Sequence, residues 1–187
     1  MKKSIVLSIA MILGSLVFAQ SAEQRAIAKE VPLQLRVKEV KATLPPSAKS
    51  NTAKKSTKEK VKVKKMAWQA TISGGSTNLT RKIELKAYYV GQQEGELDFL
   101  KTDTKPIEFE SSGKAQILLE SPVTKLVKTD KGSSGDRIDG LIAQLLVDGT
   151  VIRTFASKPV WAKVAWQTEL KSEDLLPNKA RQKKDSK

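Results

Sequence analysis

The stretch DGLIAQLLVDGTVIRTFASKP, residues 139–159, decides the fold of this chain. Two aliphatic runs flank the pair Asp148-Gly149, which favours a type I′ hairpin because both central residues adopt positive φ. Aliphatic residues occupy both odd and even positions of each run. We therefore expect this hairpin to be buried on both faces, or to be covered by the ends of the chain. The predicted core positions are Leu141, Leu145 and Val147.

The segments on either side of the hairpin alternate apolar and polar residues, as strands do. Strands are predicted over Leu33–Val37, Met66–Ile72, Ile83–Tyr89, Ile107–Phe109 and Ala115–Leu119. The strand at 83–89 is expected to have one buried and one solvated face. About seven short strands without long helical periods predict an all-β protein, an antiparallel immunoglobulin-like or fibronectin-like β-sandwich. Short helical segments are expected at 23–30 and 168–176.

The first nineteen residues have the organisation of a signal peptide. Lys2 and Lys3 form a positive n-region, and an apolar run over 5–18 leads to Ala19, where small or aliphatic residues suit a signal peptidase. The run is shorter than the roughly 20 apolar residues that span a bilayer. We therefore expect cleavage near Ala19 and export to the periplasm or the cell surface, with no membrane span in the mature protein.

The rest of the chain divides by composition. We expect an N-terminal segment with the first strand (20–45), a mobile lysine-rich loop (46–60), the main sandwich (61–167), and a short helix with a basic tail (168–187). Without the signal peptide, 32 basic residues stand against 20 acidic ones. Segments 46–66 and 178–187 carry +7 and +4 of this excess. The folded body is therefore nearly neutral, and the basic charge is concentrated in two segments.

These two segments have two interpretations. One is solvated linker and tail, because low hydrophobicity with high charge does not favour ordering. The other is contact with a polyanion, which would release counterions and weaken with salt. The predicted polyanion contacts are Lys54, Lys55, Lys58, Lys60, Lys183 and Lys184. Neither segment interleaves aromatic residues with its lysines, so we expect no nucleic acid partner.

The composition excludes most hydrolase and zinc-site designs. The chain has no histidine and no cysteine, so it lacks the commonest metal ligand and the thiol nucleophile. Stability must come from packing and hydrogen bonds rather than from disulfides. We therefore expect a protein that is not an enzyme and that holds no cofactor or metal.

Three patterns were considered as sources of chemistry. Ser111-Ser-Gly-Lys114 has the Ser-x-x-Lys spacing of penicillin-binding enzymes, but it lies between two predicted strands, where a turn is expected. Gly132–Gly135 lacks the Gly-Lys-Ser/Thr ending of a phosphate loop and is expected to be a mobile loop. The acidic residues that a glycosidase pair could use are Asp98, Asp103, Glu108 and Glu110. Glu108 and Glu110 alternate with apolar residues and are expected to be solvated.

Aromatic residues supply the candidate protein contacts. Trp68 and Tyr89 lie on apolar faces and are predicted core residues. Tyr88 lies on the polar face of its strand and is predicted to be exposed. Trp161 and Trp166 either close the end of the sandwich or form an exposed patch. The predicted partner contacts are therefore Tyr88, Trp161 and Trp166.

The order of Trp68–Ile72, Ile83–Val90, Gly140–Thr154 and Ser157–Val160 resembles small secreted Ig-like proteins of Verrucomicrobia and related bacteria. One of these is grouped with type IV pilus-like components. The resemblance spans about 61–166 and consists of strand patterns without a catalytic motif. It implies an Ig-like fold and association with a pilus, and it carries over no binding residues.

These observations favour an exported, non-catalytic binding or assembly module, an accessory of a type IV pilus-like or other cell-surface system, with a protein partner. The alternative is a surface protein that binds a polyanion such as mucin, lipopolysaccharide or a cell-wall polymer through its lysines. A lysine-driven contact should weaken with ionic strength, whereas a sheet-packed interface should not.

Overall fold

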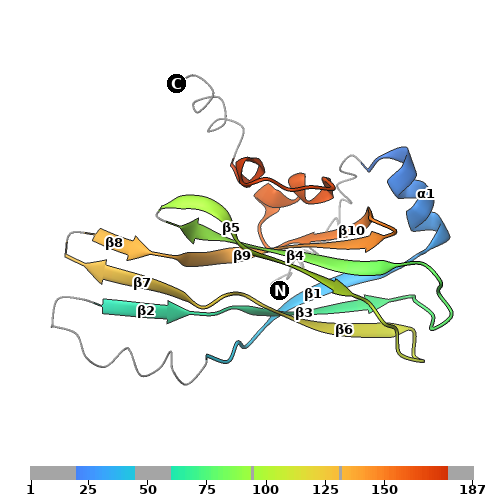
Figure 1. Ribbon diagram of the computed structural model, residues 1–187, viewed down its shortest axis with the longest axis horizontal. Coiled ribbons are helices and arrows are strands. Elements are labelled where there is room, and N and C mark those ends of the chain that lie inside the picture. Colours follow the sequence, from blue (N-terminus) through green and yellow to red (C-terminus); the bar gives the residue numbers. More distant parts are fainter. Residues whose placement is uncertain (1–19, 45–59, 94, 131, 177–187) are drawn as a thin grey trace, which may run out of the picture.

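The computed structural model describes residues 20–44, 60–93, 95–130 and 132–176 (Figure 1). Its elements are α1 (Ala22–Glu30), β1 (Gln34–Val40), β2 (Lys60–Lys64), β3 (Ala67–Ser73), β4 (Ile83–Gln93), β5 (Glu96–Pro106), β6 (Lys114–Glu120), β7 (Thr124–Thr129), β8 (Gly132–Gly135), β9 (Arg137–Val147), β10 (Thr150–Ala156), η1 (Pro159–Trp161), η2 (Val164–Trp166) and η3 (Ser172–Leu175). Strands dominate and every strand pairing is antiparallel, which confirms the all-β class. The predicted signal peptide, most of the lysine-rich loop and the basic tail lie outside the described residues.

Two of the three sheets face each other across the main apolar core. One has the strand order β1-β3-β6 and the other the order β10-β9-β4-β5. Inward side chains from both sheets form one buried cluster. In it, the rings of Trp68 on β3 and Tyr89 on β4 lie 6.2 Å apart between centroids. The prediction that Trp68 and Tyr89 belong to the core is confirmed.

Helix α1 begins with a capping box. The Ser21 hydroxyl accepts a hydrogen bond from the Gln24 backbone N–H, and the Gln24 side chain accepts one from the Ser21 N–H. Ile27 and Ala28 pack against the main core. The helix expected at 23–30 is thus confirmed. Within the described ranges, no helix is both long and apolar enough to cross a membrane.

The hairpin of β9 and β10 has the predicted geometry. Asp148 and Gly149 have φ of 49° and 82°, as a type I′ turn requires. The three predicted core residues Leu141, Leu145 and Val147 are fully buried. Because β9 pairs with β10 on one side and β4 on the other, its polar backbone groups are satisfied inside the molecule.

The C-terminal segment 157–176 covers the outer face of the β10-β9-β4-β5 sheet (Figure 1). The buried residues of this second cluster are Tyr88, Val90, Ile142, Trp161, Ala165 and Leu175. The Gln144 side-chain amide holds the segment by donating to the carbonyl oxygens of Ala165 (2.8 Å) and Gln167 (2.6 Å). The hairpin is therefore buried on both faces, as expected. The solvated face predicted for β4 is wrong from Tyr88 onward, because this segment covers it.

The third sheet, with the order β2-β7-β8, projects beyond the other two, and we call it the arm (Figure 1). Each of its strands continues a strand of a main sheet: β2 leads into β3, β7 follows β6, and β8 leads into β9. The pairing of β7 with β8 therefore joins the two main sheets at one end. At the end of β8, Gly135 has φ of 105°, and a Cβ there would overlap the Lys125 carbonyl oxygen. A glycine is required at this change of sheet.

Two predicted segments differ from the structure. Ile107 and Phe109 do not form a strand; they follow β5 and pack their side chains against the main core. Strand β5 itself was missed, because an edge strand with many polar residues lacks a clear apolar alternation. Gly132–Gly135 is strand β8 rather than a loop, since main-chain pairing with β7 holds it and its side chains give no pattern.

Candidate functional site

The strand register gives the arm two chemically different faces. Residues directly opposite each other in an antiparallel pair share a face. Lys62 lies opposite Leu126, and Lys64 lies opposite Thr124, so these share a face with Lys128. Val61 lies opposite Val127 on the other face, and Val63 lies opposite Lys125. We call the first the lysine face and the second the valine face.

The arm has no apolar core of its own. Within the described part of the chain, neither buried apolar cluster includes a residue of the arm. The side chains of Val61, Val63, Leu126 and Val127 are half-buried. A three-stranded sheet gains stability by packing an apolar face against another element. The valine face therefore offers a surface that a partner can cover.

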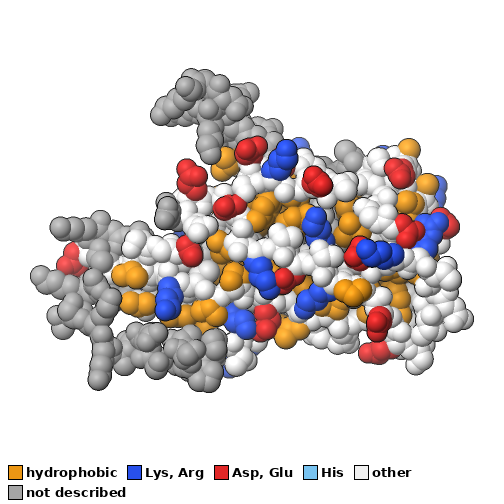
Figure 2. All heavy atoms as spheres, viewed as in Figure 1, with side chains coloured by type: hydrophobic (Ala, Val, Ile, Leu, Met, Phe, Trp, Pro, Cys, Tyr) orange, Lys and Arg blue, Asp and Glu red, His pale blue; other side chains and the backbone are white. Residues whose placement is uncertain are grey.

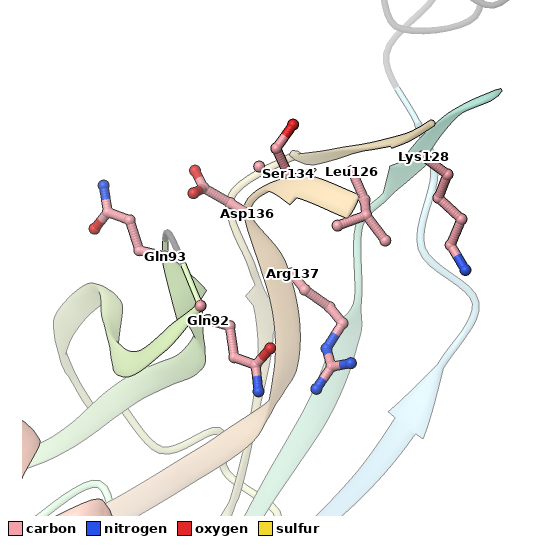
Figure 3. A pocket seen from close by; sticks show the side chains of 9 residues that line it. Gln92, Gln93, Leu126, Lys128, Ser134, Asp136 and Arg137 are labelled. Carbon is pink, nitrogen blue, oxygen red and sulfur yellow. The ribbon is translucent and has the colours of Figure 1, made fainter. Parts of the chain in front are cut away.

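A cleft of about 580 Å³ lies at the base of the arm (Figure 3). It opens where the chain passes from β8, which pairs with β7, to β9, which pairs with β4. Leu126 and Lys128 of the lysine face line one side, and Gln92 and Gln93 of β4 line another. Figure 3 shows Gln92 and Arg137 projecting on the same side of their paired strands. The cleft is thus continuous with the lysine face.

The base of this cleft is almost neutral. The Arg137 guanidinium donates to both carboxylate oxygens of Asp139, at 2.9 and 3.2 Å. The Lys158 ammonium lies 3.7 Å from the same carboxylate. Asp136 adds a further carboxylate to the lining. Excess positive charge is therefore found on the lysine face rather than at the base.

The aromatic residues predicted as partner contacts are mostly buried. Tyr88 and Trp161 are 3% and 1% exposed, because the C-terminal segment, which includes Trp161, packs on the sheet face that carries Tyr88. The exposure predicted for Tyr88 is wrong, and Trp161 forms part of the cover rather than a surface patch. Trp166 is half-buried, and its carbonyl oxygen accepts a hydrogen bond from the Gln24 side chain (3.3 Å).

The predicted polyanion contacts lie largely outside the described residues. Five of the six lysines lie outside the described residues: Lys54, Lys55, Lys58, Lys183 and Lys184. The sixth, Lys60, is the first residue of β2. The lysines that the structure gathers on one face, Lys62, Lys64 and Lys128, were not singled out. The alternation KVKVK at 60–64 was the signal that could have identified them, because it places every lysine of a strand on one side.

None of the patterns considered for catalysis forms a reactive arrangement among the described residues. Ser111 to Gly113 form a turn, as expected. Glu108 and Glu110 are exposed, also as expected. The Asp98 carboxylate accepts from the Ser172 hydroxyl. No group of three or more acidic residues in the described ranges could hold a metal ion.

One ionic cluster spans the open side between β5 and β6. Asp103 pairs with Lys101 at 2.7 Å, and Glu120 pairs with Lys65 at 2.6 Å. Beneath them the Tyr89 hydroxyl is buried without a hydrogen-bond partner. Its burial, and then the negative charge of Asp103, raise the pKa of Tyr89 well above its ordinary value. Because its charges are mutually paired, this cluster offers little attraction to a charged ligand.

No family model, no curated protein and no solved structure matches this chain.

Proposed function

We propose that this protein is an exported, non-catalytic binding module of a cell-surface assembly, and that the valine face of the arm contacts a protein partner. One observation carries the proposal: the arm extends past both main sheets (Figure 1), and its valines share one face and belong to neither buried cluster. An arm of this kind is suited to burial against another protein. The resemblance to small secreted Ig-like proteins, one of them grouped with type IV pilus-like components, favours a surface assembly as the setting.

The strand order supports an Ig-like sandwich as the body of this module. A constant-type Ig sandwich pairs its first, second, fifth and fourth strands in one sheet, and its third, sixth and seventh in the other. With the arm strands set aside, β1-β3-β6 corresponds to the first, second and fifth strands of the former sheet. The sheet β10-β9-β4-β5 corresponds to the latter, and the fourth strand, β5, lies at its edge, as the strand that variable-type domains add does. Such sandwiches commonly serve as rigid supports for binding surfaces.

A binding function is also favoured by the lack of histidine and cysteine in the sequence. Of the carboxylates considered for hydrolysis, Asp103 pairs with Lys101 and Asp98 accepts from Ser172, while Glu108 and Glu110 are exposed. The second function considered, polyanion binding, is favoured by a separate observation, the lysine face.

Site-specific photo-cross-linking in intact cells tests the protein contact. A photoreactive amino acid at Val61 or Val127 should give an adduct of one reproducible size. The same amino acid at Arg36 should give no such adduct, because Arg36 is exposed on β1 of the body, away from the arm strands. Adducts of equal yield from all three positions, or from Arg36 alone, would contradict the proposal.

A further inference from the structure

We propose that the lysine face and the adjoining cleft bind a linear anionic polysaccharide. The inference rests on the proposed function, since it assigns a second ligand to the same binding arm. Strands β2, β7 and β8 contain five lysines and no acidic residue. Lys62, Lys64 and Lys128 share the lysine face and are exposed. This surface therefore has the charge to attract an anionic chain.

Among the described residues, the three lysines of the lysine face have no ion pairs, whereas several lysines of the body do. On the body, Lys65, Lys82 and Lys101 each pair with a carboxylate within 3.0 Å. Figure 2 shows basic and acidic side chains interspersed over the body on the face it presents. By contrast, no ion pair among the described residues involves Lys62, Lys64 or Lys128. Their charges remain available to a ligand.

The spacing of these cations suits a chain with repeated anions. Alternate residues of a strand lie roughly 7 Å apart, and neighbouring strands lie about 4.8 Å apart. Lys62 and Lys64 therefore form a row along β2, with Lys128 displaced onto β7. A polymer that follows this row can contact several lysines at once. Each contact releases counterions, so the affinity should depend on salt.

The shape beside the row favours a chain over a flat membrane. Leu126 and Lys128 of the lysine face also line the cleft, and Gln92, Gln93 and Gly95 of the β4–β5 hairpin line its other side. This hairpin would hold a planar bilayer away from the cleft, whereas a narrow chain can enter. A lipid surface is therefore disfavoured as the ligand.

The polar groups of the cleft favour a sugar polymer over other polyanions. Gln92, which projects on the same side as Arg137 in Figure 3, presents an amide that can donate to and accept from hydroxyl groups. The paired Arg137 and Asp139 leave the base nearly neutral, which suits uncharged hydroxyls. The arm strands contain no aromatic residue on which bases could stack.

The test measures binding of the full chain to dextran sulfate, with uncharged dextran as the control. The triple variant Lys62→Gln/Lys64→Gln/Lys128→Gln should lose roughly tenfold or more in affinity and have a shallower dependence on salt, by about one unit of log–log slope per contact removed. The matched variant Lys38→Gln/Lys41→Gln/Lys114→Gln removes the same charge from exposed positions outside the arm. It should bind nearly as the unchanged protein does. Unfolding curves of all variants check that each folds.

Three outcomes would overturn the proposal. Equal losses in the two triple variants would mean that binding follows net charge alone. Tighter binding to inorganic polyphosphate or to phosphatidylglycerol vesicles than to dextran sulfate would reject a polysaccharide. Equal binding of uncharged dextran would reject charge as the cause. Cross-linking from Val61 and Val127 is a separate measurement on the other face, so failure of the protein contact and failure of this site can be told apart.

Discussion

The body and the arm share continuous strands but are stabilised by different means. Strand β3 has the sequence AWQATIS, and Trp68, Ala70 and Ile72 point into a core between two sheets. Two residues earlier, β2 has the sequence KVKVK and belongs to a single layer. In the body, burial of side chains supplies the stability. In the arm, main-chain pairing and covalent continuity with the body have the larger share, so substitutions in the two regions should have unequal effects.

The largest effect is expected for Leu145→Ala. Leu145 is fully buried in β9, and removing a core leucine side chain costs roughly 2 to 5 kcal/mol in free energy of unfolding. Leu118→Ala is the matched control, because Leu118 is 52% exposed on β6 and should change stability by about 0.5 kcal/mol or less. Denaturant unfolding measures both. Similar losses in the two variants would contradict the location of the core.

A second variant tests how the C-terminal segment is held. Gln144→Leu removes the donor to the Ala165 and Gln167 carbonyl oxygens and should cost about 1 to 3 kcal/mol. Amide hydrogen exchange should increase over 157–176 and remain unchanged in the arm. Gln116→Leu, at an exposed position of β6, is the control and should change neither quantity. Unchanged exchange in Gln144→Leu would mean that apolar packing alone holds the segment.

The same substitution at two glycines compares the regions directly. Gly149→Ala forces a left-handed conformation on alanine in the body and should lower global stability by roughly 1 to 2 kcal/mol. Gly135→Ala adds an overlap with the Lys125 carbonyl oxygen, yet its effect should be confined to the arm. Faster hydrogen exchange in β7 and β8, with little change in global unfolding, is the expected result. A global loss in Gly135→Ala larger than in Gly149→Ala would show that the arm and the body unfold together.

The smallest effect is expected for Val127→Ala on the valine face. Val127 is half-buried in the arm, so the change in free energy of unfolding should be about 0.5 kcal/mol or less. Val147→Ala is its counterpart in the core and should cost about 1.5 to 3 kcal/mol. Thermal and denaturant unfolding of the pair give the ratio. A loss in Val127→Ala as large as in Val147→Ala would mean that the valine face is packed within the protein itself.

Features that depend on local residue chemistry could be predicted from the sequence. The Asp148-Gly149 turn follows from the requirement for positive φ, and the core positions of β9 follow from their aliphatic character. The burial of Tyr88 could not be predicted in this way. It follows the polar residues Lys82, Glu84 and Lys86 on its face of the strand, and its cover comes from Trp161 and later residues, more than seventy positions along the chain.

The arm shows a related reason why parts of the candidate site were missed. The residues of β8, Gly132 to Gly135, have no apolar alternation, and their strand conformation depends on pairing with β7. The lysines of β2 fall within the basic segment 46–66, for which the sequence predicts a solvated linker or a polyanion contact. Only the register with β7 shows that Lys62 and Lys64 share a face with Leu126. Composition therefore indicated positive charge but not its arrangement.

The continuity of the arm with β3, β6 and β9 also has a mechanical consequence. A partner that pulls on the arm would apply force along three strands of the body. Two of them, β3 and β6, belong to one main sheet, and β9 belongs to the other. Tension along a strand loads the hydrogen bonds of its ladder in parallel, whereas tension at a hairpin end breaks them one after another. The geometry is therefore suited to resisting extension, and an adhesive load at the arm would be distributed through the body before any single strand is released.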